Sequence, residues 1–307
     1  MSTPTGPASG LPVRMPRPRQ SGRHRRPEPV VAPEGAAALV LAVPGTPSPA
    51  SRSVAEEVIS IARSELPGLN AVIGYLEGDD EEFPALASVL AQQATERVAA
   101  YEQATAAGRA VPAPEGPSAV VVPLLAGPDS ALIRRIRQAV MESGTQVELT
   151  DVLGPHPLLA EALHVRLSEA GLARADRARL FTVATAADGI VLATVGGDEA
   201  VKAAGITGML LAARLAVPVM AAALDVEGSV SSIADQLKNA GSVQLALAPY
   251  LVGPEVDTGL LDAAAKEAGC ATAEPLGAYP AIGKLVLSLY ASALGISPAV
   301  PQGVPAH

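Results

Sequence analysis

The strongest constraint on the fold of this chain is a segment that occurs twice. The stretch VVVPLLAGPD at 120–129 returns as LALAPYLVGPE at 245–255, with Pro123 on Pro249 and Gly127 on Gly253. A preceding pair matches LVLAVPG at 39–45 with IVLATVG at 190–196, and a following pair matches LGPHPLLAEALHVRL at 153–167 with LGAYPAIGKLVLSLY at 276–290. Three pairs in the same order indicate one domain-sized unit used twice.

Both halves alternate apolar runs with segments of helical periodicity. In the first half the expected strands are 36–43, 71–78, 119–126 and 146–153, and the expected helices are 53–65, 84–107, 129–143 and 157–170. In the second half the strands are 189–195, 217–224, 243–249 and 271–275, and the helices are 198–215, 229–240, 257–268 and 280–294. Uninterrupted apolar strands are typical of parallel sheets covered on both faces. The sequence therefore predicts an α/β fold of two similar parallel-sheet domains facing across a cleft, where ligands often bind.

Charge and composition set the domain limits and exclude some partners. The head, residues 1–35, is rich in Pro and Arg and holds six Arg and two Glu, a net charge of +4. Because the whole chain has a net charge of −9, residues 36–307 carry −13. We expect a disordered basic tail over 1–35, domains over 36–171 and 187–295, and a tail over 296–307. An acidic globular part argues against nucleic acid as its partner.

Two further observations concern redox chemistry and membranes. Cys270 is the single cysteine, which excludes an internal disulfide and a cysteine-based zinc site, and we interpret it as a small buried residue. The longest apolar stretch, 208–224, is cut by Arg214 and Pro218, so no membrane span is expected. The head lacks the apolar run of a signal peptide, and a cytoplasmic location is expected.

The order of these motifs resembles the sirohydrochlorin chelatase family in its two-domain form. The resemblance runs from about 37 to 294 and is carried by VVVPLL at 120–125 with Gly127, by LGPHPLL at 153–159, by PLGAYP at 275–280 and by APYL at 248–251. It implies a chelatase-like fold, a sirohydrochlorin-like tetrapyrrole as partner, and Co²⁺ or Fe²⁺ as substrate for insertion on the way to cobalamin or sirohaem. No permanently bound cofactor is implied, and the oligomeric state stays open.

The chain departs from that family at the positions that handle the metal. The family places histidines at two strand ends of the first half, where this sequence has Pro44 and Ala131. Neither residue can bind a metal or accept a proton, both of which histidine does well. The resemblance leaves Gly45, Thr46, Gly127, Asp129 and Ser130 as candidate substrate-binding residues. Three functions stay open: a chelatase with replacement ligands, a tetrapyrrole-binding protein without catalysis, and a partner-binding protein that uses the basic head.

Other residues at strand ends have two interpretations each. His156 is the candidate stand-in for a lost histidine, but capping of the helix that starts at Pro157 is the favoured interpretation, because capping contacts are commonplace. Asp129 and Ser130 fit an N-cap of the helix that follows them, and Ser53 or Ser51 fits the cap of the first helix. The acidic turn at 77–82 could gather a cation or simply be solvated. Gly196-Gly197 at a helix start could bind an anion.

Overall fold

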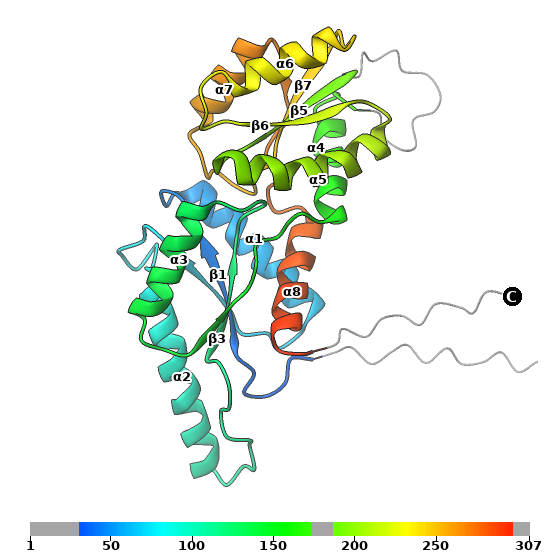
Figure 1. The fold of residues 1–307 in the computed structure, drawn as a ribbon. Helices are drawn as coiled ribbons and strands as arrows, with labels where there is room; N and C mark the ends of the chain where they lie inside the picture. Colours follow the sequence, from blue (N-terminus) through cyan, green and yellow to red (C-terminus); the bar gives the residue numbers. More distant parts are fainter. Residues whose placement is uncertain (1–30, 174–186, 297–307) are drawn as a thin grey trace, which may run out of the picture.

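The computed structural model describes residues 31–173 and 187–296, which form two parallel sheets covered by helices (Figure 1). The first sheet holds β1 (Ala38–Val43), β2 (Ala71–Tyr75), β3 (Ala119–Pro123) and β4 (Val147–Leu149) in the order β2-β1-β3-β4. The second holds β5 (Gly189–Thr194), β6 (Val219–Ala223), β7 (Leu245–Pro249) and β8 (Ala271–Thr272) in the order β6-β5-β7-β8. The α/β prediction is confirmed, and β4 and β8 are shorter than expected.

Eight helices follow these strands, one after each strand, within the described residues. They are α1 (Pro49–Glu65), α2 (Leu86–Ala106), α3 (Ser130–Glu142), α4 (Pro157–Glu169), α5 (Gly197–Leu215), α6 (Ser229–Asn239), α7 (Thr258–Ala268) and α8 (Pro280–Ala293). Each expected helix is present. The first one begins earlier than expected, because Ser48 and not Ser51 or Ser53 is its N-cap. Ser48 Oγ accepts from Ser51 N at 3.1 Å, Ser51 Oγ accepts from Ser48 N at 2.9 Å, and Pro49 occupies the first turn, where its missing N–H costs nothing.

The two sheets repeat each other residue by residue. Ala42 pairs with Pro123 between β1 and β3, and Ala193 pairs with Pro249 between β5 and β7. This register places Gly45 and Gly196 at equivalent positions, three residues beyond the paired alanines. Both glycines have a positive φ, 79° and 109°. The expected equivalence of the two halves therefore extends from the strand order to the turns at the strand ends.

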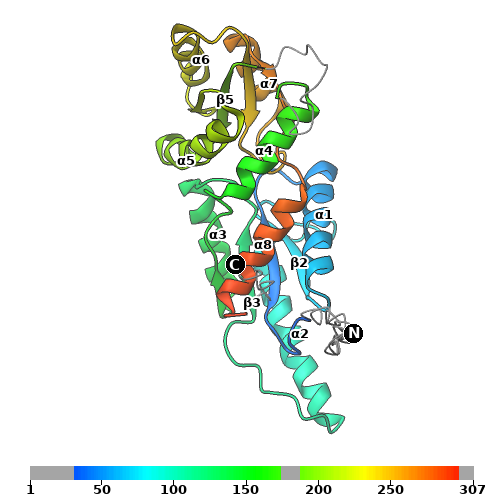
Figure 2. The same ribbon diagram turned by 90° about the vertical axis from the view of Figure 1, so that its right-hand side faces the viewer.

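The last helix of each half packs mainly on the other half (Figures 1 and 2). Helix α4 follows the first sheet but packs against α5 and β7, whereas α8 follows the second sheet and packs against α1 and β3. One hydrophobic cluster consequently runs through both domains and includes Leu39, Leu163, Leu192, Tyr250 and Val286. Separate clusters fill the outer face of each sheet. The two domains thus share a hydrophobic core.

The described part of the chain begins at Val31. Residues 1–30 of the basic head lie outside the described residues, whereas 31–35 are described and form hydrogen bonds with the first domain. Ala32 N donates to Pro67 O at 2.9 Å, and Gly35 O accepts from Arg97 Nε at 3.2 Å. These hydrogen bonds to its backbone hold the segment although it has few side chains to bury. Among the described residues, no helix is long and apolar enough to cross a membrane.

Candidate functional site at the domain junction

The carboxyl ends of the strands in both sheets face each other at the domain junction, which is where open α/β sheets bind ligands. In the first domain, the turn after β1 contains Pro44, Gly45 and Thr46. Thr46 Oγ1 donates to Glu77 Oε2 at 3.2 Å, and Arg135 Nη1 donates to Glu77 Oε1 at 2.9 Å. The hydrogen bond from Arg135 lowers the pKa of Glu77, and the bond from Thr46 adds to this. The acidic turn at 77–82 therefore has structural partners, because Glu77 connects the β1 turn to α3.

The turn after β3 uses its polar residues to start a helix. Asp129 is the N-cap of α3, and one of its carboxylate oxygens accepts from Ala131 N and Leu132 N, both at 2.9 Å. Ser130 is the first residue of the helix. The capping interpretation of Asp129 is confirmed, although its half-buried position still lies at the junction.

The equivalent turn after β7 carries Glu255, a residue that the sequence analysis did not select. Its Oε1 accepts from Val252 N at 2.8 Å and Gly253 N at 3.4 Å. Burial raises the pKa of Glu255 to about 8, an effect that the two backbone N–H groups oppose and the negative charge of Asp129 reinforces. The alignment of Pro128 with Pro254 carries the signal that could have found it, because the next residue is acidic in both copies.

These turns pack against each other across the junction. A Cβ added to Gly45 would lie 3.6 Å from the carbonyl oxygens of both Pro254 and Glu255. In the equivalent contact, a Cβ added to Gly196 would lie 2.7 Å from Pro128 O, a distance that real Cβ atoms do not tolerate. Glycine is therefore required for the close approach of backbone at the second contact. The centre of the junction is closed.

Tyr250 fills the junction beside these contacts. It follows β7, is fully buried, and its hydroxyl lies 3.0 Å from Thr207 Oγ1 of α5. A Cβ on Gly127 would lie 3.3 Å from the Tyr250 ring, and a Cβ on Gly154 would collide with its hydroxyl. Burial raises the pKa of Tyr250 to about 12. The candidate residue Gly127 thus accommodates an aromatic ring of the second domain.

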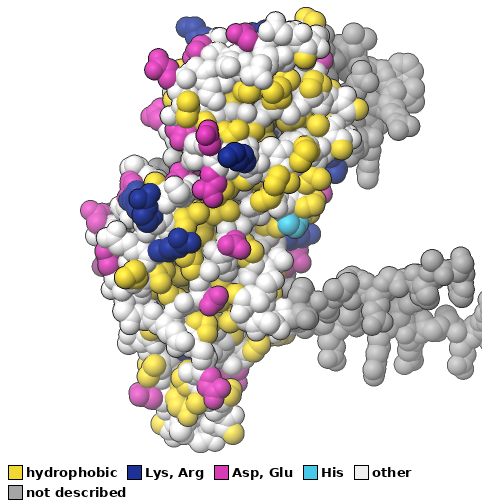
Figure 3. Space-filling model, in the orientation of Figure 1, with side chains coloured by type: hydrophobic (Ala, Val, Ile, Leu, Met, Phe, Trp, Pro, Cys, Tyr) yellow, Lys and Arg dark blue, Asp and Glu magenta, His cyan; other side chains and the backbone are white. Residues whose placement is uncertain are grey.

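The spaces on the two sides of this closed centre differ in volume. A groove of about 530 Å³ opens between α3, the residues after β4, and the first turns of α5. It is lined by Ile133, Ile136, Arg137, Leu149, Thr150, Asp151, Val152, Glu199 and Ala203, with Pro123, Pro128, Gly154 and Pro155 at its base. On the other side, only about 10 Å³ remains between Pro44, the start of α1 and the Glu255 turn. Figure 3 shows Lys and Arg side chains over α3 and the start of α5, beside the open groove.

The remaining sequence candidates have internal partners. His156 is the N-cap of α4: its Nδ1 accepts from Leu158 N at 3.1 Å, and burial lowers its pKa. His164 is buried and its Nδ1 accepts from Arg214 Nε at 2.8 Å. Gly196 N, at the start of α5, donates to Asp225 Oδ2 at 3.1 Å, so a carboxylate of the chain itself already occupies this helix start.

The described residues hold no group of three or more His, Cys, Asp or Glu side chains placed to bind a metal ion. Cys270 is half-buried, and burial raises the pKa of its thiol, in agreement with a structural role. The junction therefore provides a groove lined by one cationic side chain, Arg137, and several apolar side chains. The five sequence candidates lie after β1 and β3 at the carboxyl edge of the first sheet, and none of them is among the residues that line the groove: Gly45, Thr46, Gly127, Asp129 and Ser130.

The comparisons with known proteins place this fold among chelatases. No family model matches the chain, and no curated protein matches it. The sirohydrochlorin chelatase SirB from Bacillus subtilis subspecies spizizenii, solved in complex with cobalt, is 12% identical, with a TM-score of 0.55 over 84% of this chain and 94% of that one. SirB from Bacillus subtilis with Fe³⁺ is 13% identical, with a TM-score of 0.56 and the same coverage.

A third similar structure is DR2241 from Deinococcus radiodurans, a multi-domain protein described as structurally similar to chelatases with two additional domains. It is 19% identical, with a TM-score of 0.52 over 84% of this chain and 55% of that one. At these identities the comparisons establish a chelatase-like fold, in agreement with the resemblance of the motifs.

Proposed function

We propose that this chain binds a sirohydrochlorin-like tetrapyrrole in the open groove at the domain junction, as a chelatase-derived protein whose metal insertion is weak or absent. The observation that carries this proposal is the groove of about 530 Å³ at the carboxyl ends of the strands, in a fold shared with SirB. Its volume lies in the range of small-molecule sites. It also opens to solvent along α3, so a larger macrocycle could be bound with one edge inserted.

The chemistry of the groove suits a flat ligand with acidic substituents. Ile133 and Val152 offer apolar contacts for a macrocycle. Arg137 is the one cationic side chain among the lining residues, and a guanidinium can bind a carboxylate through two parallel hydrogen bonds. Tetrapyrroles of this kind carry several carboxylates. Asp151 and Glu199 on the same walls would repel them, so we expect Arg137 to fix the orientation of the ligand.

The residues at the family's metal positions support loss of insertion. Insertion requires a group that holds Co²⁺ or Fe²⁺ near the macrocycle and a group that accepts the two pyrrole protons. Pro44 and Ala131 can do neither, and the His156 Nδ1 is engaged as a helix cap. The space beside Pro44 is also too small for more than about one water molecule. Binding without turnover is therefore the better-supported form of the proposal.

The test measures binding first and insertion second. Purified full-length protein is titrated into sirohydrochlorin, and the absorbance and fluorescence of the macrocycle report binding. Arg137→Gln should weaken binding about tenfold, as expected for loss of a charge-assisted hydrogen bond. Arg134→Gln, an exposed arginine on the same helix outside the groove lining, is the matched control.

Addition of Co²⁺ or Fe²⁺ to the same mixture then measures metallation. A rate close to the uncatalysed one is expected. Insertion well above that rate would contradict the loss of catalysis, and His156→Ala would then be examined. Absence of saturable binding would refute the tetrapyrrole proposal itself.

A further inference from the structure

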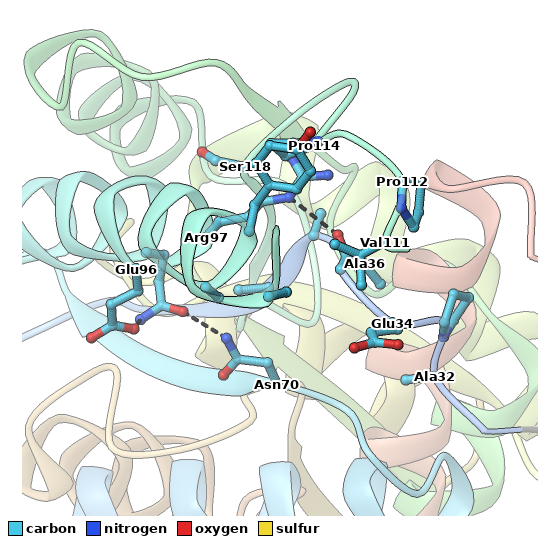
Figure 4. Close-up of a pocket in the computed structure, with 18 of the residues that line it drawn as sticks. Ala32, Glu34, Ala36, Asn70, Glu96, Arg97, Val111, Pro112, Pro114 and Ser118 are labelled. Carbon is cyan, nitrogen blue, oxygen red and sulfur yellow. Dashed lines mark hydrogen bonds between the residues drawn. The ribbon is translucent and has the colours of Figure 1, made fainter. Parts of the chain in front are cut away.

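A second cavity lies at the opposite edge of the first sheet, where β1, β2 and β3 begin (Figure 4). Its volume is about 440 Å³, within the range of small-molecule sites. The walls are the second half of α2, the loop 108–118 and the segment 32–36. Tyr290 of α8 closes one side, and its hydroxyl donates to Ala37 O at 2.7 Å. This cavity is separate from the groove at the domain junction.

Arg97 of α2 holds two of these walls in place. Its Nε donates to Gly35 O at 3.2 Å, its Nη1 to Pro117 O at 2.7 Å, and its Nη2 to Glu115 O at 2.9 Å. The guanidinium therefore binds the carbonyls of both irregular segments that border the cavity. It is committed to building the walls and has little donor capacity left for a ligand.

A chain of amide side chains crosses the cavity wall and ends at a carboxylate. Asn70 Nδ2 donates to Gln93 Oε1 at 2.8 Å, and Gln93 Nε2 donates to Glu96 Oε2 at 2.7 Å. Gln92 Nε2 donates to the other oxygen of Glu96 at 2.7 Å. The side-chain donors of this hydrogen-bonded row all point toward Glu96. Among the described residues, no cationic side chain pairs with Glu96 and no donor reaches Asn70 Oδ1.

The remaining polar groups make the cavity rich in acceptors. Arg109 is paired with Glu34 at 3.1 Å across the opening, where both side chains are exposed. In the view of Figure 4, Asn70 lies between Glu96 and Glu34. Besides the Tyr101 hydroxyl, the available groups are carboxylate and amide oxygens, while the neighbouring lining is apolar and includes Ala36, Ala100, Val111 and Pro112. A ligand that satisfies both must combine hydrogen-bond donors with a compact apolar body.

We propose that this cavity is a binding site for a small organic cation, one that carries an amidinium, guanidinium or ammonium group on a compact apolar body. The cationic group binds Glu96 and the acceptor oxygen of Asn70, and the apolar body lies against the Ala100 and Pro112 side of the cavity. The strong negative charge of the folded part of the chain favours a cation over an anion of the same shape.

Benzamidine and benzoate form a matched pair of probes, because they share a ring and differ in the charge of the attached group. Binding to the full-length protein is measured by saturation-transfer NMR and calorimetry. We expect saturable benzamidine binding at concentrations below about 10 mM and at least tenfold weaker benzoate binding. Equal binding of the two probes, or saturable binding of neither, would overturn the proposal.

Two variants locate the binding. Glu96→Gln removes the charge and should weaken benzamidine about tenfold, whereas Glu102→Gln, an exposed carboxylate on the same helix outside the lining, should not. Ala100→Leu fills the cavity from an exposed helical position and should also abolish binding. Ala106→Leu, outside the lining, controls for the added leucine. Benzamidine binding that survives both Glu96→Gln and Ala100→Leu would place the probe elsewhere and refute this site.

Discussion

Gly45 of the first domain lies directly against the backbone of Glu255 in the second, with only 3.6 Å between the position of a Cβ on Gly45 and the carbonyl oxygen of Glu255. The equivalent contact of Gly196 with Pro128 is tighter still. The duplicated turns therefore meet twice at the centre of the molecule. Because the domains also exchange α4 and α8, the junction is held by packing on both sides of this centre.

The first prediction concerns the tighter contact. Gly196→Ala should lower the free energy of unfolding by about 3 kcal/mol, because it combines a left-handed backbone with a collision at Pro128 O. Gly197→Ala is a matched control, since Gly197 also has a positive φ but an added Cβ would meet open space. It should lose only about 1 kcal/mol. Urea unfolding measures the loss of unfolding free energy in each variant. Equal losses in the two variants would show that the contact with Pro128 does not require glycine at position 196.

The second prediction follows from the raised pKa of Glu255. The folded protein holds a proton on Glu255 up to pH about 8, whereas the unfolded chain releases it near the ordinary value of 4.5. Between these values the folded state binds more protons, so stability should decrease as pH rises from about 4.5 to about 8 and level off above.

The loss should be about 2 kcal/mol, less than the full pKa difference implies, because part of the residue is reached by solvent. Glu255→Gln keeps an acceptor for Val252 N and cannot ionise, so its stability should be flatter over this interval than that of the wild type. Urea midpoints at a series of pH values provide the comparison. Parallel curves for the two proteins would mean that Glu255 ionises normally in the fold.

A feature of the fold or the site could be predicted from the sequence where neighbouring residues along the chain determine it. The alternation of strands and helices followed from the apolar runs and the helical periodicity, and the equivalence of Gly45 with Gly196 followed from the repeated motifs. The Asp129 and His156 caps followed from residue type beside a helix start. Ser48 was missed because three serines lie within six residues, and only the position of Pro49 in the first turn decides between them.

The packing of distant elements against each other could not be predicted in the same way. Helix α8 is apolar on several faces, so its sequence does not say which domain it covers. Tyr250 occupies the place of Leu124 in the duplicated unit, and its reach into the first domain depends on Gly127 and Gly154 making room. The difference in volume between the two sides of the junction likewise results from contacts between side chains of different domains. Pairwise fit of this kind leaves no periodic signal in one sequence.

The third prediction concerns the buried pair of hydroxyls at the junction. Tyr250→Phe should cost about 1–2 kcal/mol, because it leaves the fully buried Thr207 hydroxyl without its partner. Thr207→Val should cost a similar amount. The double variant should cost less than the sum of the two, with a coupling of about 1 kcal/mol. Strict additivity in urea unfolding would indicate that the two hydroxyls do not stabilise each other.

The last prediction separates two explanations for weak metal insertion. If only the ligands were lost, Pro44→His with Ala131→His would rebuild the family's pair and restore insertion. The structure favours a different outcome. Ala131 is exposed at the start of α3 and accepts a larger side chain, but Pro44 borders a space of about 10 Å³ next to Gly253 and Pro254, where an imidazole does not fit.

We therefore expect the double variant to insert Co²⁺ less than tenfold faster than the wild type, although general acid–base catalysis by a well-placed group is typically worth about 10²–10⁴-fold. Ala131→His alone should fold with near wild-type stability, and Pro44→His should account for the loss of stability in the double variant. Sirohydrochlorin metallation and thermal unfolding of the three variants measure these effects. A gain of about a hundredfold or more in the double variant would show that the junction opens enough to admit a histidine, and that the missing ligands alone explain the weak activity.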